Sequence, residues 1–161
     1  MTEMTKKIDE RVKAAQHVHF IGIGGIGVSA LARMMLMDKK IVSGSDASSS
    51  VITEELGKLG ATIYTGHAAE HIGDDVDLVV HTIAIPADNP ELVKAKARKI
   101  FTVTYPELLG SASRDYYTIA ISGTHGKTTT TGMIAHMLKE LGKQPTAVIG
   151  SLLKTAEGER S

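Results

Sequence analysis

The chain has 161 residues, of which 42% are hydrophobic, and it contains no cysteine. This composition predicts a packed core, and it excludes disulfides, thiolate metal sites and a cysteine nucleophile, as fits a cytoplasmic protein. The formal net charge is zero and 4% of residues are aromatic, so we expect neither a nucleic acid partner nor insertion into a membrane.

Strands and helices are predicted to alternate along the first two-thirds of the chain. An exposed N-terminal helix is expected within residues 1–16. Apolar runs then predict strands at 17–21, 40–43, 61–64, 77–81 and 100–103. Helices are predicted at 28–37, at 51–59, from Asn89 onward and at 105–113. This βαβ spacing is typical of a parallel α/β sheet, so residues 17–113 are predicted to form a Rossmann-like domain.

A second α/β unit is predicted to occupy residues 114–161, after a linker at 111–115. It would open with a buried strand at Tyr116–Ile121, continue with a helix at Gly132–Leu141 and reach a further strand at Thr146–Ile149. Two strands and one helix are too few to cover a sheet on both faces. We therefore expect this unit to be incomplete within the sequence.

A glycine-rich turn in the second unit predicts a phosphate site. The segment Gly123–Thr129 reads Gly-Thr-His-Gly-Lys-Thr-Thr and lies between a predicted strand and a helix. Backbone N–H groups and a helix N-terminus attract phosphate there, while Lys127 supplies a cation and Thr128 a hydroxyl for Mg²⁺. The spacing is not that of a Walker A loop, because Ile121 stands where that loop has its first glycine. We expect ATP at this turn; the alternative is a turn that only caps the helix.

A second glycine-rich turn lies near the start of the chain. Gly22, Gly24 and Gly27 fit the pattern G-x-G-x-x-G, and Asp46 follows the next predicted strand. By itself this pattern favours a dinucleotide such as NAD. Two phosphate-binding turns in one chain instead favour two phosphorylated ligands, a nucleoside diphosphate compound here and ATP at the later turn. The alternative is that these glycines serve only helix–strand packing.

Four segments resemble the Mur ligases of peptidoglycan synthesis, in the same order along the chain. They are His19–Gly27, Ser43–Asp46, Ala84–Glu91 and Gly123–Thr131. The Gly22–Gly27 loop favours the member that adds L-alanine to UDP-N-acetylmuramate over the relative that attaches a tripeptide to the same compound. The resemblance implies a ligase in which ATP phosphorylates the lactyl carboxylate and the amine of alanine attacks the acyl phosphate.

The resemblance also assigns roles by position. Lys127 would neutralise the transferring phosphoryl group, Thr128 would ligate Mg²⁺, and His125 would act in catalysis or simply fit the loop. The residues implied to cradle ATP are Gly123, Thr124, His125, Gly126, Lys127, Thr128 and Thr129. Those implied to bind the UDP sugar are Gly22, Gly24, Gly25, Ile26, Gly27, Ser45, Asp46, His67, Thr82, Ala84 and Ile85.

The family's chain extends well beyond this sequence. Residues 114–161 would form only the start of its central ATP-binding domain, and its C-terminal domain would be missing altogether. We therefore expect the chain to be inactive by itself. The alternatives are a non-catalytic module that binds UDP sugars, the tripeptide ligase and an NAD-dependent oxidoreductase.

Overall fold

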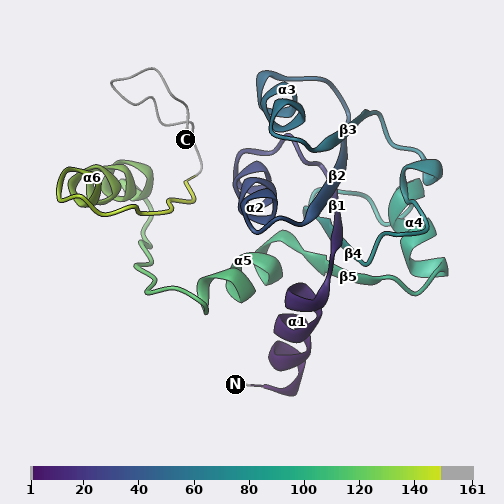
Figure 1. Ribbon diagram of the computed structural model, residues 1–161, viewed down its shortest axis with the longest axis horizontal. Coiled ribbons are helices and arrows are strands. Elements are labelled where there is room, and N and C mark those ends of the chain that lie inside the picture. Colours follow the sequence, from purple (N-terminus) through teal and green to yellow (C-terminus); the bar gives the residue numbers. More distant parts are fainter. Residues whose placement is uncertain (1, 150–161) are drawn as a thin grey trace. The chain divides into compact units, whose positions relative to one another are not determined.

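A five-stranded parallel sheet organises the first part of the chain (Figure 1). The structure is a computed structural model that describes residues 2–149. The strands are β1 (His17–Ile21), β2 (Ile41–Asp46), β3 (Thr62–Thr65), β4 (Leu78–His81) and β5 (Phe101–Thr104). The sheet order is β3-β2-β1-β4-β5, so the predicted α/β fold is confirmed. The order reverses beside β1, which opens a crevice at the carboxyl ends of β1 and β4.

Helices cover both faces of this sheet. The long helices are α1 (Glu3–Ala14), α2 (Ile26–Met37), α3 (Val51–Lys58), α4 (Pro90–Ala97) and α5 (Tyr105–Ser113). Helix α4 and the short 3₁₀ helix η1 (Ala69–His71) lie on one face, while α2, α3 and α5 lie on the other (Figure 1). The central strand β1 is consequently buried on both sides, including the side chain of His19.

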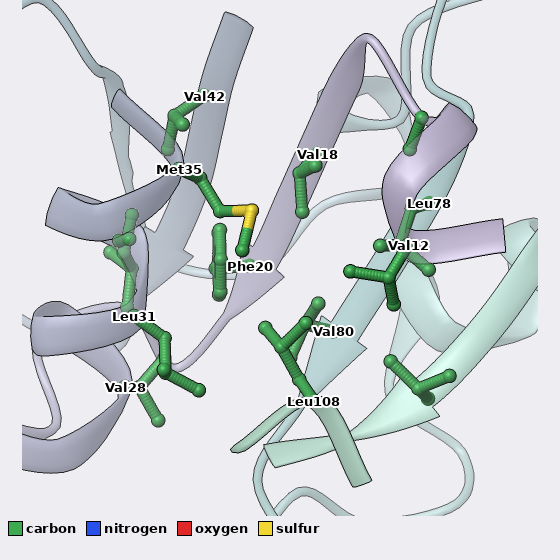
Figure 2. Close-up of a cluster of buried hydrophobic side chains, with 14 of the residues drawn as sticks. Val12, Val18, Phe20, Val28, Leu31, Met35, Val42, Leu78, Val80 and Leu108 are labelled. Atoms are coloured by element: carbon green, nitrogen blue, oxygen red, sulfur yellow. The ribbon is translucent and has the colours of Figure 1, made fainter. Parts of the chain in front are cut away.

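The larger core lies between the sheet and α2, α3, α5 and α1. Phe20 of β1 lies at its centre, close to Met35 of α2 and Val80 of β4 (Figure 2). Helix α1 joins this core through Ile8 and Val12, while most of its other residues are exposed. The predicted exposed helix is therefore confirmed except for this buried stripe. Burying two such side chains stabilises the fold by roughly 1.5–3 kcal/mol each, because the apolar surface leaves water.

Polar contacts also hold the same helix, at its C-terminal end and at Asp9 in its middle. The Lys40 ammonium donates to the carbonyls of Val12 and Lys13 at 3.1 Å each and of Ala15 at 2.5 Å. A cation there offsets the negative end of the α1 dipole. Arg114, just after α5, pairs with Asp9 of α1. Helix α1 therefore belongs to the same unit as the sheet.

The chain divides into two units between Tyr117 and Thr118, four residues after the predicted boundary. The predicted linker also differs, since residues 111–113 form the last turn of α5. Helix α2 begins two residues earlier than expected, and β2 continues through Asp46. None of the helices in residues 2–149 is long and apolar enough to span a bilayer.

The second unit contains helix α6 (Lys127–Glu140), the one regular element between Thr118 and Ile149. The strands predicted at Tyr116–Ile121 and Thr146–Ile149 are wrong, because these residues have no strand conformation and Tyr117 is 97% exposed. A parallel strand exists only by pairing, and the described residues 118–149 offer it no neighbour. Helix α6 begins at Lys127 rather than at Gly132, with the threonine run inside it.

Candidate functional site

The first glycine-rich loop connects β1 to α2 at the crevice of the sheet. Gly22 has a φ of +84°, and its N–H donates to the Ser45 carbonyl at 2.8 Å. The N–H of Gly25 donates a hydrogen bond to the Gly22 carbonyl at 3.2 Å, which closes the turn. The N–H groups of residues 26–28 in the first turn of α2 have no acceptor among the described residues. Such a turn is suited to binding an anion.

Asp46 holds this loop from the end of β2. Its Oδ2 accepts the N–H of Gly24 at 2.8 Å, and a Cβ on Gly24 would lie 2.9 Å from the same oxygen. The Asp46 carbonyl also accepts the N–H of Gly66 at 2.7 Å, which joins the loop after β3 to this end of the sheet. Part of the Asp46 carboxylate therefore orders the first loop of the protein itself, in addition to its implied role in binding the UDP sugar.

The segment after β4 reaches the same loop. A Cβ on Gly22 would lie 3.1 Å from Cγ2 of Thr82 and 3.8 Å from Cδ1 of Ile85. Ala84 is positioned by a bond of 3.2 Å from its N–H to the Thr82 hydroxyl. The structure thus brings together loops that are about sixty residues apart in sequence, as the strand order requires.

Tyr105 is a neighbour of this loop that the sequence did not indicate. It is the first residue of α5, and its ring lies over Gly27, where a Cβ would be 2.5 Å from the phenol oxygen. Burial raises the pKa of Tyr105, so the hydroxyl keeps its proton at neutral pH. No sequence pattern pairs these two positions, because only the packing of α5 against α2 brings them together.

Gly27 is therefore expected to tolerate alanine poorly. Gly27→Ala should lower the free energy of unfolding by about 1–3 kcal/mol, because the methyl group forces the Tyr105 ring to move. Gly25→Ala is the matched control, since its Cβ would meet nothing closer than 3.4 Å and its φ is −64°. Urea unfolding of both variants measures the difference. Equal stability of the two variants would contradict the predicted clash.

Ser45 and His67, two of the residues implied to bind the UDP sugar, join a largely buried polar network around Glu91. The Ser45 hydroxyl donates to Oε2 of Glu91 at 2.7 Å, and Nδ1 of His67 lies 3.1 Å from Oε1. His19 reaches Oε2 through Nε2 at 2.8 Å, and His71 reaches Oε1 through Nδ1 at 3.2 Å. Glu91 is fully buried and has no direct contact with solvent. The resemblance of the Ala84–Glu91 segment to the Mur ligases pointed to this part of the chain, but it did not predict the role of the Glu91 carboxylate.

The network continues across the sheet to the surface. His19 Nδ1 and His17 Nε2 both lie 2.8 Å from the Ser43 hydroxyl, and His17 Nδ1 lies 2.9 Å from Oδ2 of Asp75. The four contacts from Asp75 to Glu91 need four protons, but two neutral rings and one hydroxyl supply three. With both rings neutral, at most three of these four contacts can therefore be hydrogen bonds at the same time.

Hydrogen bonding determines the charge state of Glu91. Burial alone would raise its pKa, but donors from His19 and Ser45 outweigh burial and lower the pKa from 4.5 to about 2. The side chain is therefore a carboxylate at neutral pH and can only accept hydrogen bonds. Tyr64 of β3 covers the cluster by stacking on His71, with ring centroids 4.2 Å apart.

This depressed pKa predicts a pH-dependent stability. The contribution of Glu91 should be complete above about pH 4.5 and should vanish as the pH falls through about 2, because the unfolded chain binds the proton more readily. The free energy of unfolding of the wild type minus that of Glu91→Gln should rise by about 3 kcal/mol across this window. Urea unfolding at several pH values measures it, and a constant difference would contradict the prediction.

The second glycine-rich loop leads into α6. Gly126 has a φ of +78° and Gly123 a φ of +150°, conformations that other residues rarely adopt. The Lys127 ammonium folds back to the Gly123 carbonyl at 2.5 Å. Within the described residues, the N–H groups of Lys127, Thr128 and Thr129 have no acceptor. The loop and the lysine are therefore arranged as a phosphate-binding turn would be.

The fit of this loop to a metal ion depends on Thr128. Its hydroxyl lies in the first turn of α6 and has no hydrogen-bond partner in residues 2–149. Among those residues, no three His, Asp or Glu side chains are grouped so that they could hold a metal. One hydroxyl fits Mg²⁺ that is bound mainly by phosphate oxygens and water, and it does not fit a metal held by protein groups alone.

The sheet, its crevice and the loop after β1 define an α/β protein of Rossmann-like architecture. The family model "Mur ligase family, catalytic domain" matches residues 17–117, and "Mur ligase middle domain" matches residues 121–160. The chain belongs to the Mur ligase family.

Relatives within this family are similar over most of the chain. UDP-N-acetylmuramate–L-alanine ligase of Clostridium botulinum (strain Hall) is 48% identical over 144 residues, which are 89% of this chain and 31% of that protein. The enzyme of the same name from Desulforapulum autotrophicum is 48% identical over 139 residues, 86% of this chain and 30% of that protein. The chain thus spans about a third of the length of the curated relatives it matches.

Solved structures agree with this assignment. The crystal structure of UDP-N-acetylmuramate–alanine ligase from Thermotoga maritima matches with a TM-score of 0.82 and 37% identity, over 89% of this chain and 34% of that one. A murein peptide ligase from Psychrobacter arcticus matches with a TM-score of 0.74 and 31% identity, over 79% of this chain and 27% of that one.

Proposed function

We propose that the chain is part of a ligase that joins L-alanine to UDP-N-acetylmuramate with ATP and Mg²⁺, in the synthesis of peptidoglycan. The observation that carries the proposal is the 48% identity to a relative of that name over 144 of 161 residues, a span that must include both glycine-rich loops. The tripeptide-adding alternative has less support, because the murein peptide ligase is less similar in both fold and sequence.

The first loop would hold the diphosphate of the sugar nucleotide. The N–H groups at the start of α2 supply donors there, and Thr82, Ala84 and Ile85 would line the other side. Asp46 would contact the ribose with the oxygen that Gly24 does not use. His67 would reach the uridine from the loop after β3.

The second loop would bind ATP. When bound, Mg²⁺ would neutralise charge on the β- and γ-phosphates, with Thr128 as its ligand from this chain. Lys127 would leave the Gly123 carbonyl and pair with the phosphoryl group that moves to the substrate carboxylate. ADP leaves in that transfer. The alanine amine then attacks the acyl carbon, so a C–N bond forms, phosphate leaves and the amine loses a proton. His125 would contact the phosphates.

Calorimetry on the 161-residue chain tests the first half of this proposal. We expect UDP-N-acetylmuramate to bind and NAD not to bind. Binding of NAD without binding of the UDP sugar would overturn the proposal in favour of an oxidoreductase. The same chain, incubated with both substrates, ATP and Mg²⁺, is expected to form no amide, because two-thirds of the relatives' length lies outside it.

A further inference from the structure

We propose that Glu91 is a positioning residue of the first site, which fixes the tautomer of His67 so that Nε2 accepts a hydrogen bond from the nucleoside. The ligand would be a nucleoside that presents an N–H or O–H donor at that point. The inference rests on the proposed function, which brings a uridine diphosphate sugar to this end of the sheet.

The contacts of Nδ1 determine where the proton of His67 resides. Nδ1 lies 3.1 Å from Oε1 of Glu91 and 3.0 Å from the Ser45 hydroxyl. The carboxylate can only accept, and the Ser45 proton is already donated to Oε2 of Glu91 at 2.7 Å. Both neighbours are therefore acceptors toward His67, and Nδ1 must carry the proton. In the neutral ring Nε2 is then an acceptor.

The position of His67 makes this acceptor available. Its Nε2 has no partner within residues 2–149, and its side chain is 23% exposed, whereas that of Glu91 is 0% exposed. Gly66, the preceding residue, donates to Asp46, which in turn holds Gly24 of the first loop. His67 thus links the buried carboxylate to the carboxyl end of β2, beside the proposed nucleotide site.

The chemistry of the ring then distinguishes ligands. Uracil N3–H and the ribose 2′-hydroxyl can donate to Nε2. Cytosine N3 is itself an acceptor and would place one lone pair against another. A histidine that could exchange tautomers would accommodate either base. Because Glu91 prevents that exchange, a ligand without the donor should bind about tenfold more weakly, or worse.

Two substitutions at His67 test separately the role of Nδ1, which contacts Glu91, and that of Nε2, which would contact the ligand. The amide nitrogen of asparagine can replace Nδ1–H, so His67→Asn should keep the bond to Glu91 and lose the outward acceptor. Glutamine reaches the position of Nε2, so His67→Gln should restore part of the binding. His71→Asn is the matched control, because His71 has the same Nδ1 contact with Glu91 Oε1.

Calorimetry with UDP, CDP and 2′-deoxy-UDP on the 161-residue chain measures the effect. At least one of the two analogues should bind about tenfold more weakly than UDP: CDP if the base donates, 2′-deoxy-UDP if the 2′-hydroxyl donates. His67→Asn should abolish that difference and His71→Asn should preserve it. Equal affinity for all three nucleotides, or a difference that survives in His67→Asn, would overturn the inference.

The ¹⁵N chemical shifts of the histidine rings report which nitrogen of His67 carries the proton. A purely structural role of Glu91 would not affect this tautomer. In the wild-type chain Nδ1 of His67 should resonate as a protonated nitrogen and Nε2 as an unprotonated one, and UDP should shift Nε2. In Glu91→Ala the proton should exchange between the two positions. A proton on Nε2 of the wild type would overturn the inference while leaving the proposed function intact. Failure of UDP and UDP-N-acetylmuramate to bind at all would overturn the proposed function instead.

Discussion

Replacing Glu91 by alanine is expected to lower the free energy of unfolding by about 3–5 kcal/mol. The carboxylate accepts hydrogen bonds from His19, Ser45, His67, His71 and the N–H of Ala68, and it is completely buried. Removing it leaves these donors without an acceptor in the interior, where each unsatisfied group costs about 1–3 kcal/mol. Urea unfolding followed by circular dichroism measures the loss.

A glutamate nearby provides the control for this variant. Glu70 lies in η1 and is exposed, so Glu70→Ala should change the stability by no more than about 0.5 kcal/mol. If Glu91→Ala lost as little as Glu70→Ala, the network would not be a stabilising feature of the fold. Its suggested influence on His67 would then lose its structural basis.

Replacing Lys127 by alanine is expected to slow ligation in the full-length enzyme by about 10²–10³-fold, while the affinity for UDP-N-acetylmuramate remains within about twofold. The lysine opens α6, in a different unit from the first loop, and in the proposed function its charge would act on the phosphates of ATP. Release of phosphate from ATP measures the first quantity, and calorimetry with the UDP sugar measures the second.

Lys143 is the corresponding control for this substitution. It is exposed and lies after the end of α6, so Lys143→Ala should leave both quantities unchanged. If Lys127→Ala weakened binding of the UDP sugar as much as it slowed ligation, the assignment of two ligands to two separate loops would be wrong. Loss of activity in both lysine variants would indicate a general effect of charge.

Features encoded in short stretches could be predicted from the sequence. Helix α5 has the predicted bounds because Thr104 and Glu107 form a capping box around Pro106. The five strands were predicted because each is a short run of apolar or β-branched residues between turn residues. Both glycine-rich loops were predicted because close turns before a helix need glycine at fixed spacing, and the positive φ of Gly22 and Gly126 agrees.

Features that depend on residues far apart could not be predicted. His19, Ser45, His67 and Glu91 come from three strand-loop segments and one helix, and only the sheet order makes them neighbours. The strand predicted at Tyr116–Ile121 failed for the same reason, because strand pairing depends on partners that local sequence does not supply. Local propensity determined the elements and the two glycine-rich turns of this protein. Tertiary packing alone decided which side chains meet, since hydrogen bonds between distant residues depend on how the elements assemble.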